Sequence, residues 1–316
     1  MSFAYPPRKT SNPPPFKPRA SKLPHLRRSR VKTIAVFALI IIGGLWVASK
    51  IFSGHGPSKR QPSGNPKVLI VTTLDAPAYG QAHTDSIKEN RIQYAARHGY
   101  ETMFVDVDAY DLKGSPTTWS KVLALRHAMS KFPECRYMWY LDQDAYIMEP
   151  SISLEEHLMN AARLEELMLR DQSVVPPDSI IKTFTHLKGR DVDLVLTQDR
   201  EGLSVGSFVV RNGEWAQYLL ESWFDPLYRS YNFQKAENHA LEHIVQWHPT
   251  ILSKLAIVPQ NVINAYNTAE KGKQVFKAGD FVVRAPGCLK IGEGRRTCEH
   301  ELGGYKAQWK KAFDEA

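Results

Sequence analysis

Cysteine is scarce in this chain of 316 residues, which has only Cys135, Cys288 and Cys298. Their spacing fits no zinc motif, so the sequence offers no structural zinc site. In an oxidising compartment Cys288 and Cys298 can close a short loop, which would leave Cys135 as a free buried thiol. The alternative, three reduced thiols, stays open because an odd number of cysteines defines no disulfide framework.

Acidic residues are absent from the first 32 positions, which hold nine Lys and Arg residues. The rest of the chain carries 32 Lys and Arg against 33 Asp and Glu, so the net charge of +8 belongs to the N-terminal segment. The folded part is close to neutral. Net charge therefore gives no support for nucleic-acid binding, and no nucleic-acid partner is expected.

Long apolar runs are also rare. The longest uncharged apolar stretch lies between Lys32 and Lys50 and has 17 residues, the lower limit for a membrane-spanning helix. The positive charges before it predict a single-pass type II anchor with a cytosolic N-terminus. A signal peptide is the alternative, but a basic lead of this length is too long for one.

This pattern divides the chain into four expected parts. They are a Pro-rich basic cytosolic tail (1–32), a signal anchor (33–49), a stem (50–66) and a lumenal domain (67–316).

The last part is long enough for one α/β domain with a sizeable core. Short apolar runs predict strands at 67–73, 102–107 and 137–141, and helices are expected between them at 84–98 and 119–130. This order is typical of one half of a doubly wound sheet. Later strands are expected at 193–198, 206–211 and 281–284, and later helices at 154–169, 214–224 and 237–247.

The segment YMWYLDQDAYIMEP, residues 137–150, is the most informative of the chain. Its apolar strand ends in Asp142 and Asp144, and residues two apart on an extended segment point to the same side. A charge pair between apolar runs must be paired or bound to a metal. Hard cations such as Mg²⁺ and Mn²⁺ take oxygen ligands and share them with phosphates, so a sugar-nucleotide diphosphate fits this site.

Two further Asp-x-Asp pairs occur, Asp106/Asp108 and Asp191/Asp193. The bare tripeptide is expected about once by chance in a chain of this length. These two pairs lack the apolar flanks of the first, so we interpret them as solvated carboxylates at strand ends or in loops.

At this point the chain resembles a known family, glycosyltransferase family 34, whose members are metal-dependent retaining enzymes of the GT-A fold. The resemblance covers roughly residues 66–305 and is carried by WSKVLALRHAM, LDQDAYIMEP, GSFVVRN, AENHALEHIVQWHPTIL, VPQNVINAY and GDFVVRAPGC. It implies an α/β fold with a GT-A-type, Rossmann-like mixed sheet and flanking helices. Among the branches, the chain is most similar to the fungal Golgi mannosyltransferases of mannan polymerase complexes.

The resemblance also implies roles for individual residues. Asp142 and Asp144 match the motif that holds Mn²⁺ against the donor diphosphate. Lys121 matches a lysine near the diphosphate, where a buried cation would offset leaving-group charge. Glu237 and Asn238 match an acidic-Gln pair that faces the donor sugar. The expected donor contacts are Thr72, Lys121, Gly206, Ser207 and Arg284.

Three positions depart from the family pattern. Asn238 is one methylene shorter than the usual Gln, and Ser204 replaces a more usual Asn. Arg284 stands where the family usually has a histidine that completes the metal site. A guanidinium cannot bind a metal. Arg284 is therefore expected either to contact the diphosphate directly or to mark a weakened metal site.

These features predict a Golgi hexosyltransferase that moves mannose from GDP-mannose to a mannan or N-glycan acceptor, with retention and an α-1,6 linkage. The family implies a front-face mechanism, in which the departing phosphate assists the acceptor hydroxyl. An α-galactosyltransferase using UDP-galactose is the alternative within the class. A non-catalytic subunit that acts beside other mannosyltransferase subunits is the alternative outside it.

Overall fold

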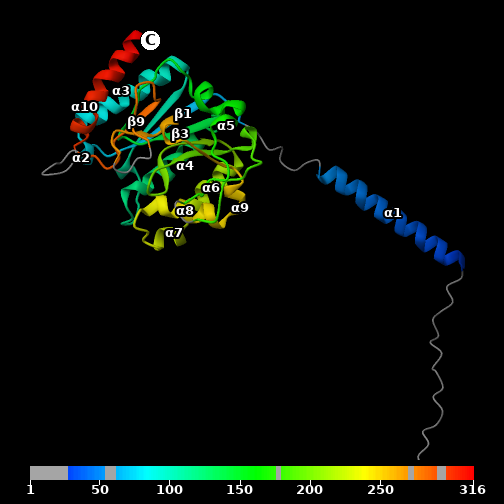
Figure 1. Ribbon diagram of the computed structural model, residues 1–316. Coiled ribbons are helices and arrows are strands. Elements are labelled where there is room, and N and C mark those ends of the chain that lie inside the picture. Colours follow the sequence, from blue (N-terminus) through cyan, green and yellow to red (C-terminus); the bar gives the residue numbers. More distant parts are fainter. Residues whose placement is uncertain (1–27, 54–61, 176–178, 270–273, 290–296) are drawn as a thin grey trace, which may run out of the picture. The chain divides into compact units, whose positions relative to one another are not determined.

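The computed structural model describes residues 28–53, 62–175, 179–269, 274–289 and 297–316 (Figure 1). Its contacts divide the chain into two units, Met1–Arg60 and Gln61–Ala316. The predicted basic tail and stem lie mostly outside the described residues.

The described part of the first unit is helix α1, Arg28–Ser53. Among the residues that the structure describes, no helix is both long enough and apolar enough to cross a membrane. The prediction of a single-pass type II anchor at 33–49 is therefore wrong. The uncharged apolar part of α1 is limited to the 17 residues between Lys32 and Lys50, and both ends of the helix beyond it carry charged residues.

The second unit is built on a sheet with the strand order β2-β1-β3-β6-β5-β7. β1 pairs in parallel with β2 and with β3, β6 runs antiparallel to both β3 and β5, and β7 is parallel to β5. The bounds are β1 Val68–Leu74, β2 Glu101–Asp106, β3 Tyr137–Leu141, β5 Leu194–Gln198, β6 Leu203–Arg211 and β7 Leu255–Val258. β1, β3, β5 and β7 are buried along their whole length, as their continuous apolar sequences require.

A small second sheet has the order β4-β9-β8, with the bounds Ala145–Ile147, Val282–Arg284 and Ala265–Tyr266. β4 follows β3 after a three-residue turn, and β9 pairs antiparallel with it. This pairing sets Ala145 opposite Arg284. The small sheet therefore brings a segment from near the end of the chain to the carboxyl end of β3.

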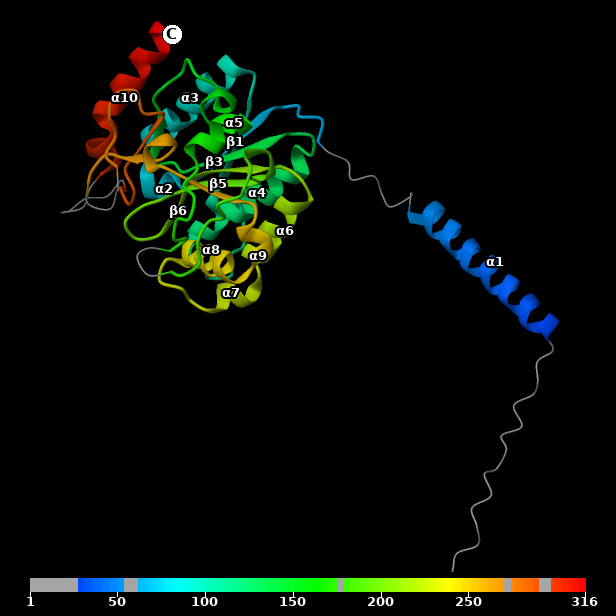
Figure 2. The same cartoon turned by 45° about the vertical axis from the view of Figure 1, so that its right-hand side comes forward.

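Helices cover both faces of the large sheet, and two hydrophobic clusters fill the spaces between (Figure 2). One cluster joins the sheet to α3 (Gln81–His98), the small sheet and α10 (Cys298–Glu315). α10 contacts α3, and the two helices lie side by side in Figures 1 and 2. The other joins it to α4 (Ser120–Lys131), α6 (Glu214–Trp223) and α8 (Ala236–Trp247). The shorter helices are α2 Ala76–Tyr79, α5 Ala161–Leu167, α7 Pro226–Ser230 and α9 Pro249–Leu252.

The expected α/β class and its mixed sheet with flanking helices are confirmed, and most predicted elements lie within a few residues of their observed ends. The predicted helix 154–169 is an exception. A π-helical turn, Glu155–Met159, precedes Asn160, whose backbone is extended and whose side chain caps α5 by accepting from Ala162 and Arg163. The extended backbone at Asn160 interrupts the helix that the apolar spacing predicted.

Candidate active site

A cavity of about 350 Å³ lies where β1 and β3 end at the edge of the large sheet. Ligands bind at this edge in doubly wound folds. The lining includes Asp142 and Asp144 from the β3–β4 turn, Lys121 from the first turn of α4, and Arg284 from the end of β9. The lining also includes Thr73, Tyr140, Asp199, Glu201, Ser204, Gly206, Lys235, Glu237, Asn238, Tyr266, Pro286 and Gly287.

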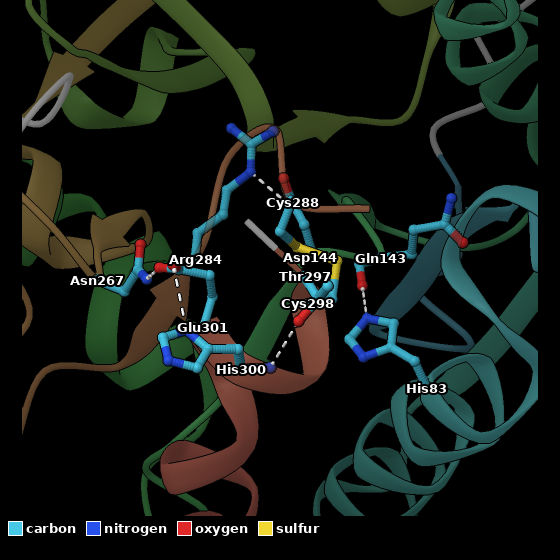
Figure 3. The surroundings of a disulfide bond; sticks show 10 residues. All are labelled: His83, Gln143, Asp144, Asn267, Arg284, Cys288, Thr297, Cys298, His300 and Glu301. Atoms are coloured by element: carbon cyan, nitrogen blue, oxygen red, sulfur yellow. Dashed lines mark hydrogen bonds and ion pairs between the residues drawn. A yellow bond between two sulfur atoms is a disulfide. The ribbon is translucent and has the colours of Figure 1, made fainter. Parts of the chain in front are cut away.

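The predicted carboxylate pair is bound by one guanidinium. Arg284 donates from Nε to Asp144 Oδ1 at 2.6 Å and from Nη2 to Asp142 Oδ2 at 2.7 Å. The expectation that both carboxylates point to the same side is therefore confirmed. Figure 3 shows Arg284 reaching Asp144. Burial raises the pKa of Asp144, opposed by the positive charge of Arg284.

Gly206 on β6 makes room for this guanidinium. A Cβ atom on Gly206 would lie 2.0 Å from both Cζ and Nη1 of Arg284, well inside any allowed contact. The guanidinium also lies over the ring of Tyr266, with Cζ 5.9 Å from the ring centroid. Arg284 is thus held between a glycine, an aromatic ring and two carboxylates.

Lys121 and Glu237 form a second ion pair in the cavity. Lys121 Nζ lies 2.9 Å from Glu237 Oε1 and 3.8 Å from Asp142 Oδ2. Burial alone would lower the pKa of Lys121, but the charges of Asp142 and Glu237 outweigh it and the pKa is raised. Lys121 therefore keeps its positive charge although its side chain is only 6% exposed.

Buried residues outside the predicted set support the β3–β4 turn. Arg91 on α3 is fully buried and donates to the backbone oxygens of Asp142 and Ala145 at 2.9 and 2.7 Å. The hydroxyl of Tyr140 donates to Asp142 Oδ1 at 2.8 Å, with Thr73 Oγ1 2.7 Å from that hydroxyl. Sequence reasoning missed Arg91 because a polar residue on a helix is usually exposed.

A hydrogen-bonded group around Tyr266 was also missed. The Tyr266 hydroxyl donates to Asp199 Oδ2 at 2.8 Å and lies 3.0 Å from Ser204 Oγ. Asn264 donates to Ser204 Oγ at 2.8 Å and to Thr197 Oγ1 at 2.9 Å. Ser204 therefore has protein partners at the position where the resemblance expects an Asn.

Two predicted donor contacts lie inside the protein instead of at the cavity. Thr72 is fully buried and donates to the backbone oxygen of Leu141, while its neighbour Thr73 lines the cavity. Ser207 is fully buried and accepts from Trp139 Nε1. Side chains alternate along a strand, so a shift by one residue moves a side chain to the other face.

The disulfide between Cys288 and Cys298 ties the loop after β9 to the first turn of α10 (Figure 3). The predicted short loop is thus confirmed, and Cys135 is a free buried thiol. Pro286 and Gly287, which line the cavity, lie between Arg284 and Cys288. The disulfide therefore anchors the segment that carries Arg284.

The expected Mn²⁺ does not fit this arrangement of side chains. One oxygen atom of each carboxylate, Asp142 Oδ2 and Asp144 Oδ1, already accepts from Arg284, and Asp142 Oδ1 accepts from Tyr140. In the described part of the chain, no group of three His, Cys, Asp or Glu side chains lies close enough to hold a metal ion. We therefore derive no step through a metal.

The residues of the other two Asp-x-Asp pairs do not line this cavity. Asp106 ends β2 and is exposed, and Asp193 forms ion pairs with Arg211 and Lys254 at 3.1 and 3.3 Å. Asp106 fits the interpretation as a solvated carboxylate, whereas Asp193 is only 16% exposed and is held by its two ion pairs.

Comparisons with known proteins agree with the sequence motifs. A 30% identical relative, described as an uncharacterized α-1,2-galactosyltransferase of Schizosaccharomyces pombe, aligns over 85% of this chain and 83% of its own. The probable α-1,6-mannosyltransferase MNN10 of Saccharomyces cerevisiae is 34% identical over 63% of this chain and 54% of its own. The chain thus spans little more than half of that relative.

Solved structures give a weaker likeness. A glycosyltransferase involved in glycosylation of the PBCV-1 major capsid has a TM-score of 0.48 and 12% identity, covering 79% of this chain and all of that one. The galactosyltransferase LgtC has a TM-score of 0.37 and 10% identity, and the match covers 78% of this chain and 95% of LgtC. The pattern of one family matches residues 64–295. The chain belongs to this family of glycosyltransferases, the galactosyl transferase GMA12/MNN10 family.

Proposed function

We propose that this chain transfers a hexose from a nucleotide-diphosphate sugar to a glycan acceptor. The observation that carries the proposal is that Lys121 and Arg284, both largely buried cations, line one cavity at the sheet edge. A departing nucleoside diphosphate develops negative charge, and fixed cations in a shielded site offset it. Mannose from GDP-mannose, with an α-1,6 linkage, is the first choice because of the resemblance and the yeast relatives.

The proposed step retains configuration. The bond from the anomeric carbon to the diphosphate oxygen breaks, and a bond from the acceptor oxygen forms on the same face. The acceptor proton passes to the departing phosphate oxygen. In this proposal Lys121 and Arg284 stabilise the diphosphate, and Glu237 and Asn238, at the N-terminal end of α8, face the sugar. Glu237 is ion-paired with Lys121 at 2.9 Å, which favours a positioning role over attack on the sugar.

The test is a variant of the buried lysine. Lys121→Met is expected to lower kcat for hexose transfer about 100- to 1,000-fold, the range seen when one fixed electrostatic donor is removed. Lys131→Met is the matched control, because Lys131 is an exposed lysine at the last position of the same helix. Equal loss in both variants, or no loss in Lys121→Met, would contradict the proposal.

A donor screen separates the alternatives. The purified chain is incubated with each nucleotide sugar and an oligomannoside, and release of the nucleoside diphosphate is measured. Turnover of GDP-mannose is expected. Turnover of UDP-galactose alone would make the chain an α-galactosyltransferase, in line with the relatives of Schizosaccharomyces pombe.

A non-catalytic subunit is the second candidate, favoured by the carboxylate pair being bound to Arg284 and by the short Asn238. In that case the chain binds a partner chain or a glycan, and another mannosyltransferase subunit carries out the transfer. Transfer by the purified chain alone would exclude it.

A further inference from the structure

The carboxylates of Asp142 and Asp144 are bridged by a cation that belongs to the protein itself. The Arg284 side chain is 12% exposed, and those of Asp142 and Asp144 are 19% and 3% exposed. Both contacts are short, charge-assisted hydrogen bonds of the kind that a planar guanidinium makes with carboxylates. Such shielded pairs are costly to break because each group would be left buried without its partner.

A divalent ion that bridged the two carboxylates would need the oxygen atoms that Arg284 now occupies, Asp142 Oδ2 and Asp144 Oδ1. To reach them it would have to displace Arg284, whose guanidinium is permanently charged and repels a second cation. The guanidinium packs against Gly206 and lies over the ring of Tyr266. The positions of these two residues keep Arg284 at the carboxylates.

Arg284 also has donor capacity left for a ligand. Its Nε and Nη2 atoms make the two carboxylate bonds, and Nη1 takes part in neither. Arg284 lines the same cavity as Lys121. Other acidic side chains of the cavity have protein partners, since Glu201 pairs with Lys235 at 2.8 Å and Asp199 accepts from Tyr266.

We propose that Arg284 takes the place of the divalent cation, so that this chain binds its nucleoside-diphosphate ligand without metal. The inference rests on the proposed function, since it concerns the same ligand. Two carboxylates and one guanidinium leave one negative charge, where a divalent ion would leave none. The cations that would contact the diphosphate are Arg284 and Lys121, which line the same cavity.

The first experiment uses the full chain freed of metal with EDTA. Binding of GDP and of UDP is measured by calorimetry in EDTA and again with Mn²⁺ or Mg²⁺. We expect the Kd of the nucleotide that binds more tightly to change by less than about twofold between these conditions. A contact between a metal ion and the diphosphate would be expected to change the Kd by more, since each tenfold change corresponds to about 1.4 kcal/mol of binding free energy. Binding that is lost in EDTA and restored by Mn²⁺ overturns the inference and leaves the proposed function standing.

The second experiment follows Mn²⁺ alone by electron paramagnetic resonance, without nucleotide. The wild-type chain is expected to bind no stoichiometric Mn²⁺, and Arg284→His to bind one, because a neutral imidazole is a competent third ligand beside two carboxylates. Nucleotide binding by Arg284→His should then need Mn²⁺. One tightly bound Mn²⁺ in the wild type overturns the inference whatever the nucleotide does.

Arg284→Gln tests the contact with the ligand. It should weaken nucleotide binding in EDTA about tenfold to a hundredfold. The matched control is Arg211→Ala, because Arg211 pairs with Asp193 at 3.1 Å and lies outside the cavity. Unchanged binding in Arg284→Gln overturns the inference. If neither GDP nor UDP binds under any condition, the proposed function itself fails, and the inference with it.

Discussion

Gly206 is the residue on which the position of Arg284 depends most directly. In Gly206→Ala the new Cβ would lie 2.0 Å from the Cζ atom of Arg284, so the guanidinium must leave its two carboxylates. We expect the chain to stay folded and to bind GDP or UDP about tenfold more weakly, because one charge-assisted contact is lost. Calorimetry measures the binding, and thermal unfolding checks the fold.

Gly304→Ala is the control for this substitution. A Cβ on Gly304 in α10 meets no atom within 4 Å, so Ala there should stabilise the helix by about 0.5–1 kcal/mol. Nucleotide binding should not change. Wild-type affinity in Gly206→Ala would show that the guanidinium does not contact the ligand from its present position.

At the scale of elements, α8 meets β6 through a buried carboxylate. Glu242 is 7% exposed and accepts from the backbone N–H of Leu203 at 2.9 Å. Burial raises its pKa from 4.5 to about 7. The folded chain therefore holds this proton at pH values where the unfolded chain has lost it, and stability falls as pH rises from about 4.5 to about 7.

The size of this effect is at most about 3 kcal/mol. In Glu242→Gln the side chain keeps an acceptor for Leu203 and cannot titrate, so that part of the pH dependence should disappear. Urea unfolding of both proteins at several pH values measures it. A slope of stability against pH that is identical in the two proteins would contradict the raised pKa.

The disulfide is the second link between elements on which stability should depend. Cys288 and Cys298 are ten positions apart, and opening so short a loop removes about 3 kcal/mol of stability in the chain-entropy account. The double variant Cys288→Ser, Cys298→Ser should lose this amount in urea unfolding. Reductant should lower the free energy of unfolding of the wild type to that of the variant and leave the stability of the variant unchanged. No difference between oxidised and reduced wild type would contradict the prediction.

At the scale of the whole molecule, the second unit holds both hydrophobic clusters, whose members run from Val68 to Phe313. A shortened chain that begins at Gln61 is therefore expected to fold and to bind nucleotide as the full chain does. Its free energy of unfolding should agree with that of the full chain within about 0.5 kcal/mol, the range of changes that touch no core contact. A larger loss would mean that the first unit stabilises the second.

The sequence by itself determined the class of fold and the pair of carboxylates, Asp142 and Asp144, that lines the cavity. Continuous apolar runs such as Val68–Leu74 and Tyr137–Leu141 form buried strands because each face meets a hydrophobic cluster. The i, i+2 spacing of Asp142 and Asp144 was enough to place both carboxylates on one side. These are local properties, set by the period of a strand and by what lies next along the chain.

Only the tertiary structure decided what the carboxylates bind. Arg284 is 140 positions from Asp144 along the chain, and the pairing of β9 with β4 brings them together. The burial of Arg91 and the inward face of Thr72 depend equally on how the elements pack. A contact between distant residues is set by sheet register and packing, which no local pattern contains.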